Sequence, residues 1–147
     1  MKINEFIQKY RSVQEYSDDA LPPRRPTMKR THNPIVMCKD GFTMSVQAGQ
    51  SCYSVPKDVV DEYAEVEIGF PSIPEPLIIQ YAEIMDVESS TVLEDDSWLC
   101  DTVYPYVPVE VVDEVISKHG GIDESVVWDA MTESQKLTSG TYKIINT

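Results

Sequence analysis

The fold is indicated by one stretch in the first third of the chain, residues 35–48, IVMCKDGFTMSVQA. Its first residues are apolar and partly β-branched, which favours a strand. From Phe42 to Ala48 every second residue is apolar, and this period predicts a second strand with one buried face. Asp40-Gly41 lies between the two runs and predicts a two-residue type I′ turn, whose central residues both need positive φ. The stretch therefore predicts a β-hairpin.

A helix is predicted before the hairpin. Apolar residues recur at helical spacing from Ile3 to Tyr10, and the pattern extends to Val13 and Tyr16. Asn4 is the predicted N-cap. A proline-rich segment, residues 17–34, follows the helix and is predicted to be a loop, with the basic cluster of residues 24–32 inside it.

Two further strands are predicted in the middle of the chain. Residues 64–70 alternate between apolar and polar, which indicates a strand with one face in water. Residues 103–107 predict an edge strand, because Pro105 has no amide proton to donate to a neighbour. Residues 55–62 fit a helical turn or an irregular link, and residues 77–84 fit a strand or a short helix. Residues 85–101 predict an acidic loop.

Helices are predicted near the C-terminus. Pro108 is expected at the first position of a helix that ends at Gly120, with His119 as a cap that complements the helix dipole. Its predicted buried face comprises Val109, Val112, Val115 and Ile116. Asp123 is expected to cap another helix, and residues 141–145 to form a last strand or a frayed end.

These elements predict one α+β domain over residues 1–147. Its sheet is antiparallel and built on the 35–48 hairpin, with helices at the N-terminus and near the C-terminus. We expect the first helix and the basic loop in residues 1–34, the core in 35–122, and a C-terminal helix and tail in 123–147.

The charge of the chain is divided along the sequence. The formal net charge is −13, yet residues 1–39 hold eight of the twelve Lys and Arg residues and only four acids, a local net charge of +4. Residues 40–147 carry a local net charge of −17. Binding of nucleic acid depends on cationic side chains that displace counterions, so we expect no direct nucleic-acid binding by the acidic body. A surface of this sign also favours solubility.

Catalytic and metal-binding signatures are not found in the sequence. It lacks nucleophile-elbow, phosphate-loop and dinucleotide motifs, so we predict no catalytic residues, no cofactor and no enzymatic activity. Glu94-Asp95-Asp96 lacks the order of a calcium loop, so no metal site is predicted. The three cysteines, Cys38, Cys52 and Cys100, include no C-x-x-C pair and argue against a disulfide framework or a zinc ribbon.

The basic cluster and nearby tyrosines predict a ligand site. Arginine binds phosphate through two parallel hydrogen bonds, and tyrosine rings can stack on a base. The predicted ligand-binding residues are Arg24, Arg25, Lys29, Arg30, Tyr53 and Tyr106. Alternatively, these cations pair with the protein's own acids or with those of a second subunit. A different function follows from the acidic surface, which could imitate the phosphates of a nucleic acid and inhibit a protein that binds one.

Three segments together, residues 38–48, 63–72 and 102–121, resemble a family of small hypothetical proteins encoded by tailed bacteriophages. The similarity covers roughly residues 27–122. The resemblance implies a viral accessory protein that counters host defence by binding, for example by sequestering a small nucleotide signal, and that carries no catalytic residues. A minor structural protein of the phage is a further alternative.

The expected setting follows from the resemblance and the composition. No apolar run is long enough to cross a membrane and no signal peptide is recognisable, so we expect the host cytoplasm and no membrane partner. The expected partner is a small phosphorylated ligand or a host protein. The exposed edge at residues 103–107 and the surface tyrosines predict a homo-oligomer.

Overall fold

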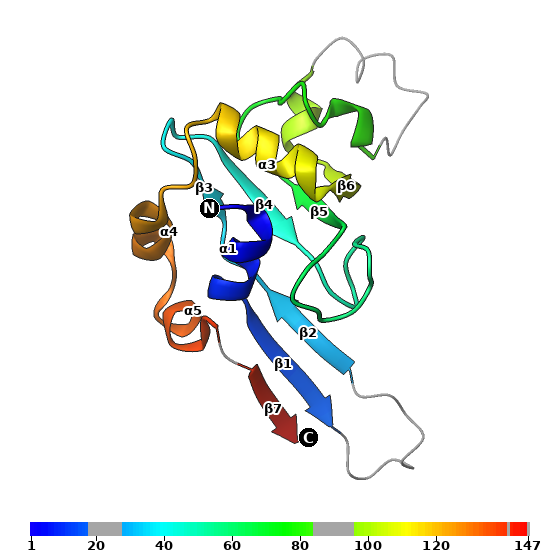
Figure 1. Ribbon diagram of the computed structural model, residues 1–147, viewed down its shortest axis with the longest axis vertical. Coiled ribbons are helices and arrows are strands. Elements are labelled where there is room, and N and C mark those ends of the chain that lie inside the picture. Colours follow the sequence, from blue (N-terminus) through cyan, green and yellow to red (C-terminus); the bar gives the residue numbers. More distant parts are fainter. Residues whose placement is uncertain (18–27, 84–95, 141, 147) are drawn as a thin grey trace.

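A computed structural model describes residues 1–17, 28–83, 96–140 and 142–146 of the chain (Figure 1). Its main sheet is antiparallel, with strand order β3-β4-β5-β6. These strands are β3 (Val36–Met37), β4 (Thr43–Gln47), β5 (Glu65–Gly69) and β6 (Val103–Pro108). The predicted α+β class is confirmed, and so are the strands at residues 64–70 and 103–107.

The predicted hairpin is present, but its turn is one residue earlier than expected. Val36 pairs with Met44, and the Gly41 amide donates to the Cys38 carbonyl, so Lys39 and Asp40 are the central residues of the turn. Gly41 follows with φ of 95°, a conformation that glycine adopts without steric cost. The predicted two-residue type I′ turn was therefore wrong. The loop is one residue longer and comprises Lys39, Asp40 and Gly41, of which only Gly41 has a positive φ.

A second sheet brings distant parts of the chain together. Its central strand β1 (Ser12–Ser17) pairs antiparallel with β2 (Met28–His32) and parallel with β7 (Tyr142–Asn146). This sheet extends below the main body in Figure 1. The basic segment was predicted to be a loop, yet its part from Met28 onward is a strand. Alternating exposure along β2 shows why: each second residue faces outward, as in a strand with one covered face.

The first helix, α1 (Ile3–Tyr10), is shorter than predicted. The helical spacing was extended to Val13 and Tyr16, but both residues belong to strand β1. Asn4 is not the N-cap; its side chain bonds both backbone groups of Tyr63. The free amide of Ile3 instead donates to the Asp113 carboxylate at 2.8 Å, so a residue from another helix caps α1.

The C-terminal helices agree closely with the sequence pattern. Helix α3 (Val109–Lys118) follows directly after Pro108, one residue later than predicted, and buries all four predicted residues of its apolar face. His119 is its C-cap, as predicted. Asp123 caps α4 (Glu124–Ala130) by accepting the Val126 amide, and α5 (Glu133–Thr138) begins with a capping box. Short 3₁₀ helices span Ile79–Tyr81 and Asp96–Cys100.

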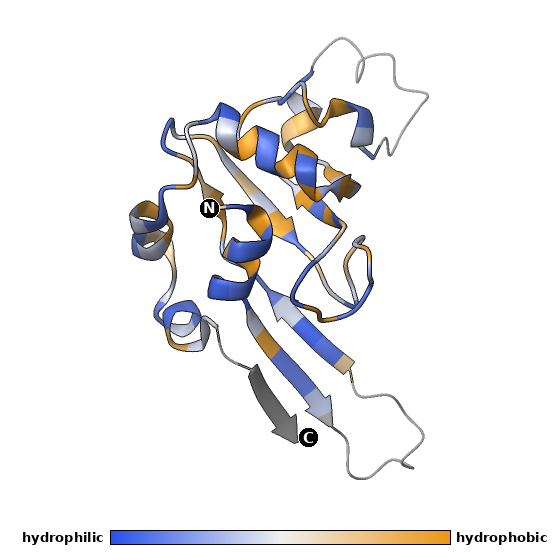
Figure 2. Cartoon of the chain, in the orientation of Figure 1, coloured by the Kyte–Doolittle hydropathy of each residue, from blue (hydrophilic) through white to orange (hydrophobic). Residues whose placement is uncertain are grey.

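The core lies between the main sheet and helices α1 and α3. Figure 2 shows apolar residues along β4 and β5 and alternating apolar and polar residues on α3. Its largest fully buried side chains include Phe6, Ile68, Met44 and Tyr104. No helix within the described ranges is both long and apolar enough to cross a bilayer.

Candidate functional site

The predicted ligand residues fall into two separate groups. Arg24 and Arg25 lie outside the described residues. Lys29 and Arg30 are neighbours on β2, so their side chains leave the strand on opposite faces. Tyr53 lies on a loop, and its ring contacts that of Tyr106 on β6. Of the four predicted residues that the structure describes, Tyr53 and Tyr106 are in contact with each other, and Lys29 and Arg30 are adjacent on β2.

Arg30 lines a polar cleft between the second sheet and α5, which we call the Arg30 cleft. Its volume is about 340 Å³. The strand register places Ser12 opposite His32 and Gln14 opposite Arg30, so these four residues share one face of the sheet. Residues of α5 line the other side of the cleft. The complete lining is Ser12, Gln14, Arg30, Thr31, His32, Ser134, Gln135 and Thr138.

Contacts within the Arg30 cleft hold its polar groups in place. The Arg30 guanidinium lies 5.7 Å from the centre of the Tyr16 ring, and the Tyr16 hydroxyl donates to Gln14 Oε1 at 3.0 Å. Gln135 of α5 reaches His32 across the cleft, with 3.1 Å between the two Nε2 atoms. No carboxylate is among the eight lining residues. In a chain of net charge −13, the lining of this cleft thus holds one arginine and no acid.

Lys29 lies on the opposite face of β2. Its amide donates to Gln50 Oε1 at 2.9 Å, and the register places it opposite Glu15 of β1. It lines a smaller cleft of about 260 Å³, together with Met28, Arg30, Gln50 and Ser51. Lys29 and Arg30 thus share this smaller cleft, but of the two only Arg30 also lines the cleft beside α5.

Tyr53 and Tyr106 form an aromatic pair around a lysine, Lys57. The sequence pattern did not predict this lysine as part of a site. Their ring centres are 5.8 Å apart and the rings are tilted by 56°. The Lys57 ammonium lies 5.3 Å from the Tyr53 ring centre and 5.6 Å from the Tyr106 ring centre. Lys57 was overlooked because it lies outside the basic cluster. Its proximity to both rings is a property of the folded loop.

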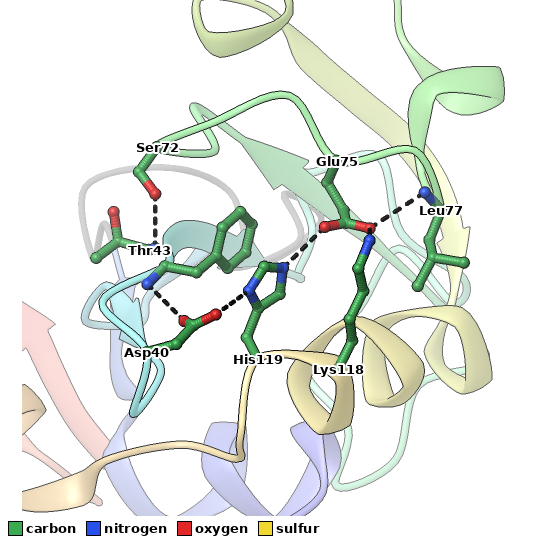
Figure 3. Close-up of polar contacts among 8 residues, drawn as sticks. Asp40, Thr43, Ser72, Glu75, Leu77, Lys118 and His119 are labelled. Carbon is green, nitrogen blue, oxygen red and sulfur yellow. Dashed lines mark hydrogen bonds and ion pairs between the residues drawn. The ribbon is translucent and has the colours of Figure 1, made fainter.

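A charge cluster with two buried members, Glu75 and His119, joins α3 to two loops (Figure 3). His119 Nδ1 lies 2.6 Å from Asp40, and Nε2 lies 2.8 Å from Glu75. Glu75 is only 1% exposed and also accepts from Lys118 Nζ at 2.7 Å. The imidazole stacks on Phe42, with 4.1 Å between ring centres. The cluster thus connects the hairpin turn, the end of α3 and the loop after β5.

The charges in this cluster stabilise one another. Burial alone would lower the pKa of His119, but hydrogen bonds to Glu75 and Asp40 outweigh it and raise the pKa above its ordinary value. Burial alone would raise the pKa of Glu75, but bonds from Lys118 and His119 hold it below its ordinary value. The arrangement favours an imidazolium between two carboxylates, and both ring nitrogens are engaged.

The charge cluster lacks the partner that nucleophilic catalysis needs. A general base must reach the proton of a nucleophile, and both nitrogens of His119 already contact carboxylates. Cys38 lies near Asp40, but burial and then the Asp40 charge raise the pKa of its thiol to about 11. A thiol of that pKa is protonated at neutral pH and is a poor nucleophile. The geometry is that of a structural clamp.

No group of three or more metal-ligating side chains occurs among the described residues. Glu94 and Asp95 of the acidic run lie outside the described ranges. All three cysteines are free thiols.

Comparison with known protein families, curated proteins and solved structures finds no match to this chain. The phage resemblance therefore stays a prediction from the sequence, and the function has to be inferred from the chemistry of the sites. Of the two described clefts that contain a predicted ligand residue, the Arg30 cleft is the larger, and none of its lining residues is an acid.

Proposed function

We propose that this protein binds a small anionic ligand, a phosphorylated molecule such as a nucleotide, in the Arg30 cleft and does not transform it. The observation that carries the proposal is the contrast between a strongly acidic protein and a cleft lined by eight polar residues without a carboxylate. The volume of about 340 Å³ falls in the range of small-molecule sites.

The lining residues supply the groups that bind phosphate. Arg30 offers the planar fork of donors that matches two phosphate oxygens. Ser12 and Ser134 add hydroxyls from opposite sides of the cleft, and Gln14 and Gln135 add amides that can bond to a sugar or a base edge. Tyr16, below the guanidinium, offers a ring on which a base can stack.

A binder of this kind fits the role that the sequence resemblance implies. A viral protein that holds a nucleotide signal without destroying it lowers the free concentration of that signal in the host. The absence of a positioned nucleophile in the described part of the chain is compatible with sequestration as the mode of action.

Titration calorimetry tests the proposal. Wild-type protein is titrated with inorganic phosphate, AMP, a cyclic mononucleotide and a cyclic dinucleotide. We expect binding of at least one nucleotide, and a loss of about 10- to 100-fold in affinity on Arg30→Gln, because a hydrogen-bonded charge contributes about 1.5–3 kcal/mol. Lys29→Gln is the matched control, since it removes the same charge from the other face of β2.

Two outcomes would contradict the proposal. The first is the absence of heat with every compound in the panel. The second is an equal loss of affinity in Arg30→Gln and Lys29→Gln, which would indicate attraction by overall charge or binding in the smaller cleft beside Lys29.

A further inference from the structure

The tyrosine pair, Tyr53 and Tyr106, already holds a cation in the free protein. The Lys57 ammonium lies within 6 Å of both ring centres, a distance at which the negative face of an aromatic ring attracts a cation. A ring tilt of 56° directs both rings toward one space instead of stacking them. Lys57 is exposed, and its ammonium group is at the end of a long flexible side chain. Another cation can therefore take its place.

The position of Tyr106 depends on an unusual backbone. The register of β5 and β6 shifts between Val66 and Ile68, which marks a β-bulge around residues 105–106 of β6. Tyr106 has φ of 55°, a left-handed conformation that non-glycine residues rarely adopt. Bulges of this kind re-aim a side chain. The Tyr106 amide donates to the Tyr53 carbonyl at 3.2 Å and so joins the two segments.

Carboxylates around the tyrosine pair favour a cation over an anion. Glu67, on the neighbouring strand β5, accepts a hydrogen bond from the Tyr53 backbone. Burial and then the nearby charge of Glu83 raise the pKa of Glu67. Asp58 follows Lys57 directly. The negative charge of Glu67, held at the Tyr53 backbone, thus favours a cationic ligand at this place over an anionic one.

We propose that the tyrosine pair is a docking site for a Lys or Arg side chain of a basic protein partner, and that Lys57 occupies this site in the free protein. The occupant follows from the seated ammonium and from charge complementarity with residues 40–147, whose net charge is −17. This site is distinct from the Arg30 cleft and takes a ligand of the opposite charge. Each proposal can therefore fail without the other.

The test measures binding of a short polyarginine peptide by calorimetry. Lys57→Ala empties the site, and we expect it to tighten peptide binding by about three- to tenfold relative to a control of equal charge. That control is Lys39→Ala, because Lys39 is also exposed but lies beside Gly121, at the end of α3. Adding Tyr53→Leu to Lys57→Ala should abolish the gain, since one ring of the pair is then lost.

The outcome is unambiguous in either direction. If Lys57→Ala and Lys39→Ala tighten binding equally, overall charge explains the effect and the proposal is wrong. If the gain survives Tyr53→Leu, the rings are not the docking site. Tyr53 and Lys57 are both exposed, so the variants are expected to fold, and circular dichroism verifies this before the titration.

Discussion

His119 shows how a single residue can be placed correctly from sequence while its role stays hidden. Lys118, His119 and Gly120 indicate the end of a helix, and the structure has His119 at that cap. Its partners Asp40 and Glu75 are 79 and 44 residues away. No local pattern predicts such contacts, because they depend on how the hairpin and the loop after β5 pack on α3.

The pH dependence of stability tests this cluster. The folded pKa of His119 is raised, so its contribution is present below the unfolded pKa and is lost as pH rises through the folded pKa. The pKa values of Asp40 and Glu75 are lowered, so their contribution is lost as pH falls through those values. Lys118 also contacts the Glu75 carboxylate, at 2.7 Å. Stability should therefore be greatest at mildly acidic pH.

Replacement of His119 should remove the alkaline part of this profile. His119→Gln is expected to lower the free energy of unfolding by about 1.5–3 kcal/mol at mildly acidic pH, the range for hydrogen bonds to charged groups, and by less at alkaline pH. Urea unfolding across the pH range measures this. His32→Gln is the control, because His32 is exposed. An unchanged slope in His119→Gln would contradict the raised pKa, because it would show that folding does not change the protonation of His119.

At the scale of elements, hydrophobic period predicted most strands and helices, and it failed where it was extended too far. The apolar spacing from Ile3 to Tyr10 is a true helix face, but Val13 and Tyr16 fit the same period by chance and belong to β1. The partner of β1 on its other side is β7, more than a hundred residues later. A parallel pairing over this separation leaves no local signal.

Of the residues that line the Arg30 cleft, the sequence predicted only Arg30 as a ligand residue, because the other lining residues come together only in the fold. Arg30 was recognised by its charge, but Ser12 and Gln14 join it only through strand register, and Ser134 only through the packing of α5. Small polar residues of this type are common on any surface. Their meaning depends on which of them the fold brings to one cleft.

The contact between the loop after β4 and β2 depends on one glycine. Gly49 has φ of 153°, and a Cβ atom at this position would collide with Thr31 Oγ1, which donates to the Ala48 carbonyl at 2.6 Å. Gly49→Ala should therefore lower the free energy of unfolding by about 1–3 kcal/mol, the usual effect of an overpacked contact. Chemical denaturation measures the change.

Gly69→Ala is the matched control for Gly49→Ala. Gly69 is also buried, but an added Cβ would lie 3.9 Å from Ser45 and Val103, which is ordinary van der Waals distance. We expect the control to be clearly milder. Equal destabilisation by both variants would mean that loss of glycine itself, and not the collision with Thr31, determines the effect.

At the scale of the whole molecule, the divided charge of the sequence is only partly retained in space. Several cations pair with acids from the acidic part of the chain: Lys9 contacts Glu124 at 2.7 Å, and Arg11 lies 3.6 Å from Asp61. Net charge along the sequence could not show which cations are consumed in this way. Arg30 differs because the fold places it in a cleft without acids.

Homo-oligomerisation is a prediction that belongs to this scale. Strand β6 is at one edge of the main sheet, as expected from Pro105, but two of its backbone groups are engaged: the Val103 carbonyl accepts from Glu83, and the Tyr106 amide donates to Tyr53. We therefore expect an oligomer to form through side chains and not through extension of the sheet. Sedimentation velocity tests this, and a single boundary at 16.6 kDa would contradict it.

The parallel pairing of β1 with β7 sets an order of events during synthesis of the protein. The four strands of the main sheet are complete once residue 108 has left the ribosome, whereas β1 must wait for residues 142–146. The α5 wall of the Arg30 cleft, residues 133–138, also emerges late. A nascent chain can thus bury most of its core before the α5 wall of the Arg30 cleft has been synthesised.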